Sequence, residues 1–279
     1  MAAIPKKVIE RYKKAVSKFQ RVLKVAQDRD VNEADTVSIV QDMLAEVFGF
    51  DKYLDITCEY AIRGTYCDLA IKMEDKIQYL LEVKAIGMTL KKPHLQQAVN
   101  YAANHGVKWV VLTNGITWEL HRMRFERPID CDLVLSINFL ELNPRKAEDQ
   151  QKLFVLSKRG IGKSVRDDYF ERVQSVNRFV IGAIVISESI MNVIRRDLRK
   201  LVPGLKVENK EIEQILRNEV LKRDVIEGEE ASKAKMRVRK ITKKAVKRAA
   251  KAPVKKPETP SVPSKSFSDI LTSEFKQER

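Results

Sequence analysis

Residues 93–106, PHLQQAVNYAANHG, are a helix-length segment that lies between two strand-like apolar runs. Pro93 suits a first helical turn and Gly106 suits a C-terminal stop. The flanking runs, Ile77–Ala85 and Lys108–Thr113, are rich in Leu, Val and Ile, as strands are. A helix that crosses from one strand to the next is the usual way to connect parallel neighbours. The segment therefore predicts an α/β fold.

Two further strand candidates, Thr57–Ile62 and Tyr66–Met73, precede this unit. The second is joined to the run at Ile77 by the polar turn Glu74, Asp75, Lys76, which is typical of a meander. After the last strand, Asn114-Gly115 is a strong hairpin signal before a fifth run, Thr117–His121. We expect a mixed β-sheet flanked by helices.

Helical patterns come before and after the predicted sheet. Residues 5–28 have apolar positions at helical spacing, and a second helix is expected from Asn32, a good cap, to Gly49. A helical domain is expected after residue 147, with residues 180–201 as its most apolar helix and Pro203-Gly204 as a break. The predicted segments are an N-terminal amphipathic helix (1–29), an α/β domain (30–147), a helical domain (148–231), a disordered basic tail (232–265), and a short terminal helix or docking peptide (266–279).

The net charge of +15 is concentrated near the C-terminus. The stretch from Lys233 to Lys256 contains twelve Lys or Arg and no Asp or Glu. Such a block stays solvated and attracts polyanions by counterion release, so DNA is the leading partner and RNA is an open alternative. The helical segment 148–231 is a candidate surface for a protein partner or for self-association.

The remaining composition excludes several classes of protein. Cys58, Cys67 and Cys131 lack CxxC or Cys/His spacing, so neither a disulfide framework nor a zinc site is indicated. The N-terminus has no apolar signal core, and the most apolar later run, residues 179–186, is too short to span a bilayer. We expect a cytoplasmic protein without a membrane segment.

Three charges stand within predicted buried strands. Asp68 lies in YCDLAI, and Glu82 and Lys84 lie in LLEVKA fourteen residues later. A buried charge is costly unless it is paired or bound to a metal. Because strand side chains alternate, Glu82 and Lys84 should emerge on one face while Val83 points to the opposite core. The pattern predicts two carboxylates and an amine that converge.

A pair of carboxylates suits a hard divalent cation. Mg²⁺ takes oxygen ligands and keeps waters, and it can polarise a phosphodiester and activate an attacking water. We expect Asp68, Glu82 and the carbonyl of Val83 to hold Mg²⁺, with Mn²⁺ as a substitute. Lys84 would orient that water or help to deprotonate it.

Asp68 followed by Glu82-Val83-Lys84 resembles the acidic strand and E-x-K of the PD-(D/E)XK nuclease superfamily. Gln97 and Tyr101 form the QxxxY pattern that restriction and related nucleases of this superfamily share, on one face of the following helix. NEADTV (residues 32–37) and the stretch 101–120 are similar to sequences of type I restriction enzyme R subunits. The resemblance covers roughly residues 28–142.

The resemblance implies a PD-(D/E)XK core and a magnesium-dependent nuclease, endo- or exonucleolytic, that leaves a 5′-phosphate and a 3′-hydroxyl. It implies Glu33 as a helix-borne third acid, and a supporting or DNA-contacting role for Gln97 and Tyr101. R subunits continue into a helicase motor, but SKRGIGKS (residues 157–164) is not a complete phosphate-binding loop. ATP-driven translocation is therefore not predicted.

Other interpretations are open for each of these residues. Asp68, Glu82 and Lys84 could form a structural ion pair between strands, and Glu33 could merely complement a helix dipole. Glu59, Glu46 and His94 are alternative site residues, while Trp109 and Trp118 are expected in the core. The alternative function is a non-catalytic nucleic-acid adaptor that recruits a partner through its helical domain. If the chain is instead the nuclease that the resemblance implies, it would serve restriction, defence or DNA processing.

Overall fold

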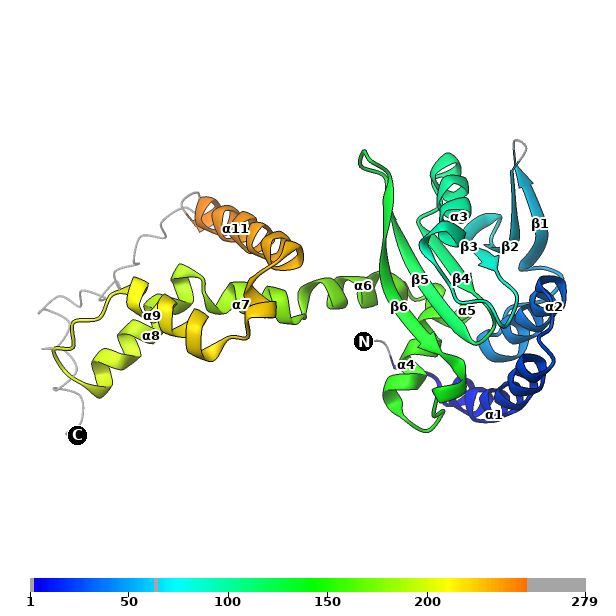
Figure 1. Cartoon of the computed structure of the whole chain (residues 1–279), viewed down its shortest axis with the longest axis horizontal. Helices are drawn as coiled ribbons and strands as arrows, with labels where there is room; N and C mark the ends of the chain where they lie inside the picture. The colour runs from blue at the N-terminus through cyan, green and yellow to red at the C-terminus, as the bar shows by residue number, and fades with distance from the viewer. Residues whose placement is uncertain (1–2, 63–64, 250–279) are drawn as a thin grey trace, which may run out of the picture. The chain divides into compact units, whose positions relative to one another are not determined.

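The computed structural model describes residues 3–62 and 65–249, with the side chains of residues 59–66 and 242–249 excepted. The chain divides into two compact units, Met1–Asn177 and Arg178–Arg279 (Figure 1). The first unit holds the sheet, and the second consists of helices in its described part.

The first unit is built on a six-stranded mixed sheet with the strand order β1-β2-β3-β4-β5-β6. Among the described strands, only β3 and β4 pair in parallel, and α3 (Lys92–His105), the crossing helix that the sequence predicted, connects them. The hairpin at Asn114-Gly115 is also confirmed, and Gly115 has the left-handed φ of 83° that this turn requires. The strands are β1 (Ile56–Ile62), β2 (Thr65–Met73), β3 (Lys76–Val83), β4 (Trp109–Thr113), β5 (Thr117–Arg124) and β6 (Asp130–Asn138).

Strand β6 was not predicted from the sequence. Its first half, DCDL, alternates between acidic and apolar residues over only four positions, and none of these residues is buried. Its pairing with β5 along Asp130–Asn138 places it at the edge of the sheet. Pairing with β5 and the burial of Val134, Leu135 and Ile137 hold this strand in the sheet.

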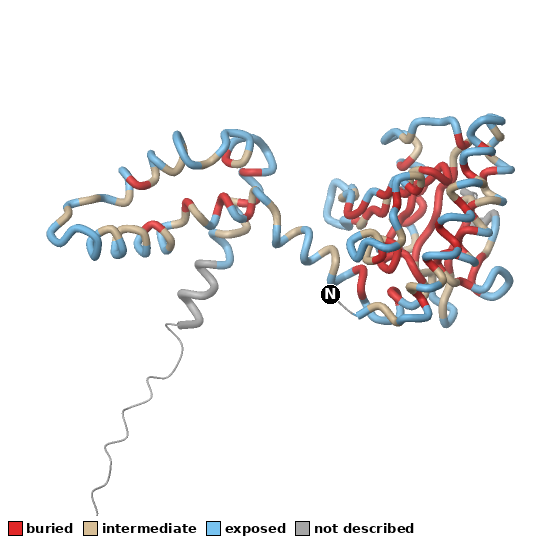
Figure 2. The backbone as a smooth tube through the Cα atoms, turned by 90° about the horizontal axis from the view of Figure 1, so that it is seen from below, coloured by how far each residue is buried: buried red, intermediate tan, exposed pale blue. Residues whose placement is uncertain are grey.

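Each face of the sheet has its own core. One face packs against α1 (Lys6–Asp28), α2 (Glu33–Met43), the π-helical turn η1 (Leu44–Phe48) and α4 (Ala147–Leu156). The other face packs against α3. Figure 2 shows the buried residues gathered along the strands of this unit. Because both faces are covered, a charge within β2 or β3 lies deep in the structure.

Local signals fix the helices that frame the sheet. Asn32 caps α2 by accepting a hydrogen bond from the Asp35 N–H at 2.9 Å. Gly49 ends the following turn with a φ of 80°. The predicted helix from Asn32 to Gly49 is thus confirmed, with its last turn widened to π geometry.

Helices α4, α5 (Lys158–Ile161) and α6 (Val165–Ser175) belong to the first unit. The Tyr79 hydroxyl donates to the Leu156 carbonyl at 3.1 Å, and the buried Arg166 guanidinium donates to the Gln78 carbonyl at 3.0 Å. These contacts with β3 explain why the division falls after residue 177 and not after residue 147. A single 3-10 turn, η2 (Phe139–Glu141), leads from β6 toward these helices.

The described part of the second unit is a set of helices with a small core of Val180, Ala183 and Ala234. The expected helix over residues 180–201 is interrupted at Ser187. Among the described residues, no helix is both long and apolar enough to cross a membrane. The elements are α7 (Arg178–Val185), α8 (Glu188–Leu201), α9 (Asn209–Ile215), η3 (Leu216–Val220), α10 (Arg223–Ile226) and α11 (Glu229–Ala249).

Helix α11 corrects the prediction that disorder begins at residue 232. Ala, Lys and Arg are strong helix formers, and Ala231 and Ala234 are buried while Val238 packs beside the core. The prediction of disorder rested on the run of like charges and gave too little weight to this helical pattern. The rest of the predicted tail, 250–265, and the predicted terminal helix, 266–279, lie outside the described residues.

Candidate functional site

Three of the predicted site residues, Asp68, Glu82 and Lys84, meet where β3 ends. The Lys84 N–H donates to the Thr113 carbonyl at 2.8 Å, which ties the residue after β3 to the end of the parallel strand β4. On the other side, the pair Leu69–Leu81 sets the register between β2 and β3, and one further step places Asp68 opposite Glu82. Two carboxylates from adjacent strands are thereby brought to one place.

Asp68 is fixed to the backbone of β3. Its Oδ2 accepts a hydrogen bond from the Val83 N–H at 2.7 Å. The Val83 side chain is fully buried in the core on the opposite face. A strand residue directs its N–H and its C=O toward the same neighbour. The carbonyl of Val83 is therefore directed to the side on which Asp68 lies.

Glu82 and Lys84 emerge together, as the alternation of strand side chains predicted. The Lys84 Nζ lies 2.8 Å from Glu82 Oε1. The side chain of Glu82 is only 1% exposed and that of Lys84 is 14% exposed. This is a buried ion pair with one polar end near solvent.

Helix α2 brings a third carboxylate to the same ammonium. Glu33 is the first residue of α2, directly after the cap Asn32. Its Oε1 lies 3.3 Å from Lys84 Nζ, and its side chain is 45% exposed. Lys84 is thus held between a buried acid on its own strand and an exposed acid on the helix.

Burial raises the pKa of Glu82 to about 7, against the pull of the hydrogen bond from Lys84 and with further help from the charges of Asp68 and Glu33. One of its oxygens, Oε2, is buried and has no hydrogen-bond partner among the described residues. A buried, unsatisfied carboxylate oxygen carries a desolvation cost that a cation or a proton would relieve.

The surroundings of Lys84 favour the charged form of its side chain. Burial by itself lowers the pKa of its ammonium, but the hydrogen bond to Glu82 and the charges of Glu82, Glu33 and Asp68 raise it above the ordinary lysine value. Lys84 is accordingly a hydrogen-bond donor at neutral pH.

The donor set fits a cation that keeps part of its water shell. Among the residues that the structure describes, no group of three or more His, Cys, Asp or Glu could hold a metal ion. Mg²⁺, however, is often bound through one or two carboxylates plus substrate phosphates and waters. Asp68, the orphaned oxygen of Glu82 and the Val83 carbonyl match that requirement.

Sequence reasoning did not identify Asn114 as a residue that positions the site. Its amide donates to the carbonyls of Ile86 at 3.3 Å and Met88 at 2.9 Å, in the loop that follows Lys84. Its Oδ1 accepts from the N–H groups of Ile116 and Thr117. The Asn-Gly pair predicted the turn, but only the fold shows that this side chain joins the turn to the Lys84 loop.

Gln97 and Tyr101, the residues of the QxxxY pattern, lie on α3, which covers the opposite face of the sheet from α1 and α2. Tyr101 is 1% exposed and packs in that core, whereas Gln97 is exposed. Residues four apart differ by about 40° around a helix. That offset moves Gln97 beyond the edge of the buried stripe formed by Leu95, Ala98, Val99 and Ala102.

The alternative site residues have other contacts. Glu46 pairs with Lys18 at 2.6 Å on the exposed side of α1 and η1. His94 Nδ1 accepts from the Lys91 N–H at 3.4 Å, at the start of α3. The side chain of Glu59 lies outside the described residues.

The two tryptophans are core residues, as predicted. Trp109 is 3% exposed and Trp118 is 1% exposed. The Trp118 indole donates to the Gly115 carbonyl at 2.8 Å, and its ring lies 5.0 Å from that of Phe48. Neither is available for stacking on a base.

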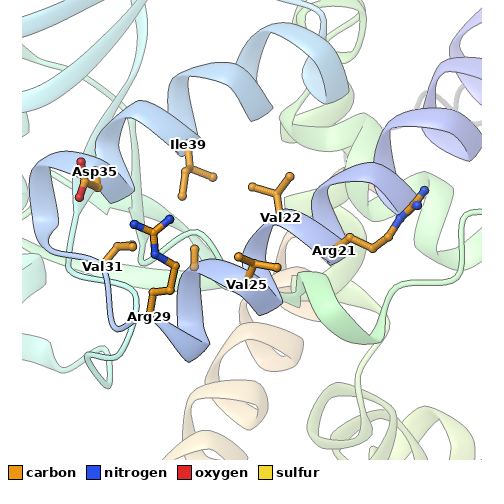
Figure 3. Close-up of a pocket in the computed structure, with 8 residues that line it drawn as sticks. Arg21, Val22, Val25, Arg29, Val31, Asp35 and Ile39 are labelled. Atoms are coloured by element: carbon orange, nitrogen blue, oxygen red, sulfur yellow. The ribbon is translucent and has the colours of Figure 1, made fainter.

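A groove between α1 and α2 lies apart from the converging acids. Figure 3 shows Val22 and Val25 of α1 facing Ile39 of α2, with Arg29 and Asp35 nearby. The residues that line it include none of Asp68, Glu82 and Lys84. The chemistry of the site therefore rests on the strand ends and not on this groove.

Comparison with known proteins identifies one part of the chain. No curated protein and no solved structure matches it. The family model of the type I restriction enzyme R protein N terminus matches residues 39–129, about a third of the chain. The matched range contains Asp68, Glu82, Lys84 and α3, and it leaves out Glu33, α1 and the second unit. Residues 39–129 are therefore similar to the N-terminal domain of type I restriction enzyme R proteins.

Proposed function

We propose that the first unit is a metal-dependent nuclease with a PD-(D/E)XK core that hydrolyses phosphodiester bonds of DNA in restriction, defence or DNA processing. The observation that carries the proposal is the convergence of Asp68, Glu82 and Lys84 at the end of β3, with one Glu82 oxygen buried and unpartnered. The similarity of residues 39–129 to a restriction enzyme domain supports it independently.

The proposed roles follow from charge and position. Asp68, Glu82 and the Val83 carbonyl would hold Mg²⁺. When bound, the metal supplies polarisation of the phosphodiester and a lowered pKa for the attacking water. Lys84, kept protonated by its carboxylates, would donate a hydrogen bond that orients that water or a phosphate oxygen. Glu33 would hold the Lys84 ammonium in place and so act as a positioning residue.

Gln97 and Tyr101 have different proposed roles. The exposed amide of Gln97 offers donors and an acceptor to a DNA backbone. Tyr101 is buried between α3 and the sheet, so it would support the strands that carry the acids. Of these two residues, only Gln97 would touch nucleic acid.

The test is cleavage of plasmid and single-stranded DNA by the full chain with Mg²⁺ or Mn²⁺ at low salt. Asp68→Asn and Glu82→Gln should abolish cleavage, Lys84→Met should lower it by about 10²–10³-fold, and the wild-type products should carry 5′-phosphates. Glu74→Gln and Lys76→Met are matched controls, because Glu74 is exposed in the turn before the same strand and Lys76 is exposed at its first position. These controls should cleave like the wild type.

A structural use of the ion pair is the rival explanation. Lys84 already pairs with both Glu82 and Glu33, so the cluster could hold α2 against the sheet without any metal. In that case the chain would bind nucleic acid as an adaptor. Undiminished DNA binding by wild type and variants, with no cleavage and no Mg²⁺ binding by calorimetry, would establish the adaptor and refute the nuclease. RNA substrates in the same assay decide the class of nucleic acid.

A further inference from the structure

A second polar site lies on the first unit, at the start of α1. Lys7, Arg11 and Lys14 line one side of a hollow there, and Arg159 of α5 lines the other. Pro5 and Val8 complete the walls near the first turn of the helix. The hollow measures about 590 Å³, which is within the usual range for ligand pockets. None of these residues lies in the range that matches the restriction enzyme domain.

The hollow concentrates positive charge that no ion pair within residues 3–62 and 65–249 neutralises. Lys7, Arg11 and Lys14 follow one another at spacings of four and three, so they lie on one face of α1. Like charges at this spacing destabilise a helix. The one acid at the hollow, Glu10, is paired with Lys13 at 2.8 Å. Within the described part of the chain, none of the four cations at the hollow has an ion-pair partner.

Arg11 adds its charge to one wall of the hollow, while its guanidinium packs against Gly49 at the end of η1. Its Nε is buried and has no hydrogen-bond partner among the described residues. One terminal nitrogen, NH2, donates to the Phe48 carbonyl at a long 3.4 Å, and the guanidinium lies 5.7 Å from the centre of the Tyr12 ring. These contacts hold the side chain in place, but they supply no negative charge.

We propose that this hollow binds phosphate groups. A guanidinium presents a fork of donors that matches phosphate oxygens, and lysine ammonium groups add point charge around it. Four cations at one hollow exceed what a single carboxylate would neutralise, so the ligand carries several negative charges. Two sources offer that chemistry, the backbone of a nucleic acid and the polyphosphate of a free nucleotide. The proposal stands whether or not the strand-end site is a nuclease.

The experiment uses the full chain and the variant Lys7→Gln/Arg159→Gln. Both residues are exposed, so the substitution leaves the fold intact, and tryptophan fluorescence checks this. The matched control is Lys24→Gln/Arg145→Gln, which removes the same charge at two exposed positions outside the hollow. Binding of a 20-base-pair duplex is measured against salt concentration, and binding of ATP and of inorganic pyrophosphate is measured by calorimetry.

If the ligand is a nucleic-acid backbone, the hollow variant should bind the duplex roughly tenfold more weakly than the control at low salt. Its dependence of log affinity on log salt should also be shallower by about two, one for each lost phosphate contact. If the ligand is a free nucleotide, the hollow variant should lose ATP and pyrophosphate binding and keep the control's duplex affinity. Variant and control that behave alike in both arms would overturn the proposal. Arg11→Gln, which removes the fork, should repeat the result of the double variant.

Discussion

The protonation of Glu82 makes the stability of the first unit depend on pH in a direction opposite to that of most acids. Burial raises its pKa from the ordinary 4.5 to about 7 in the folded chain. Between pH 4.5 and about 7, Glu82 is therefore protonated in the folded state and ionised in the unfolded state. The unfolding free energy should fall as pH rises through this window, by about 3 kcal/mol in total, since one pKa unit corresponds to about 1.4 kcal/mol.

The substitution Glu82→Gln isolates this effect, because a buried amide has a similar shape and does not titrate. Denaturation in urea is followed by fluorescence at pH 4.5, 6, 7 and 8.5. Trp109 and Trp118, the two tryptophans of the chain, both lie in the first unit, so the signal reports that unit alone. The stability of the wild type relative to Glu82→Gln should decline by about 3 kcal/mol from the lowest to the highest pH.

Two controls sharpen the experiment. Glu74→Gln removes an exposed acid from the turn before β3 and should show no such decline. At pH 8.5, millimolar Mg²⁺ should stabilise the wild type and leave Glu82→Gln unchanged, since a ligand stabilises only the state that binds it. A pH-independent difference between wild type and Glu82→Gln would refute the reasoning from burial. Equal stabilisation of both proteins by Mg²⁺ would refute Glu82 as a metal ligand.

Three further substitutions test the surrounding structure. Lys84→Met should lower cleavage by about 10²–10³-fold while Mg²⁺ binding persists, because the donor that orients water is lost but Glu82 stays; loss of Mg²⁺ binding as well would contradict this division of roles. Asn114→Ala should cost about 2–4 kcal/mol in urea denaturation, because four hydrogen bonds of a buried side chain are lost; a cost below about 1 kcal/mol would show that water replaces them. Gly160→Ala should cost at least about 2 kcal/mol, because a β-carbon would lie 1.8 Å from the Phe154 carbonyl oxygen, and an unchanged urea midpoint would show that the turn can shift.

Much of the sheet could be predicted because its signals are local. The crossover helix was set by Pro93 and Gly106, and the hairpin by Asn114-Gly115, since each of these residues suits only a few backbone conformations. Edge strand β6 has no comparable signal. Its first half carries Asp130 and Asp132, both in contact with Arg124, and it becomes a strand by pairing with β5.

The same distinction explains the site. Glu82 and Lys84 are two positions apart in an extended segment, so their side chains lie on the same face of the sheet. Their ion pair at 2.8 Å agrees with that expectation. Nothing in the spacing of Gln97 and Tyr101 indicates that one would be exposed and the other buried. That outcome depends on the angle at which α3 packs on the sheet.

The sequence by itself determined the elements whose signals are local: the capped helices, the alternating strands and the three charges placed within them. Only the tertiary structure decided which distant groups met, such as Glu33 with Lys84, Asn114 with the loop after Lys84, and Arg159 with the basic face of α1. The physical reason is the distance along the chain over which each of these effects acts. A cap or an alternation acts within a few residues, whereas the burial that raises the pKa of Glu82 is produced by strands and helices from the whole first unit.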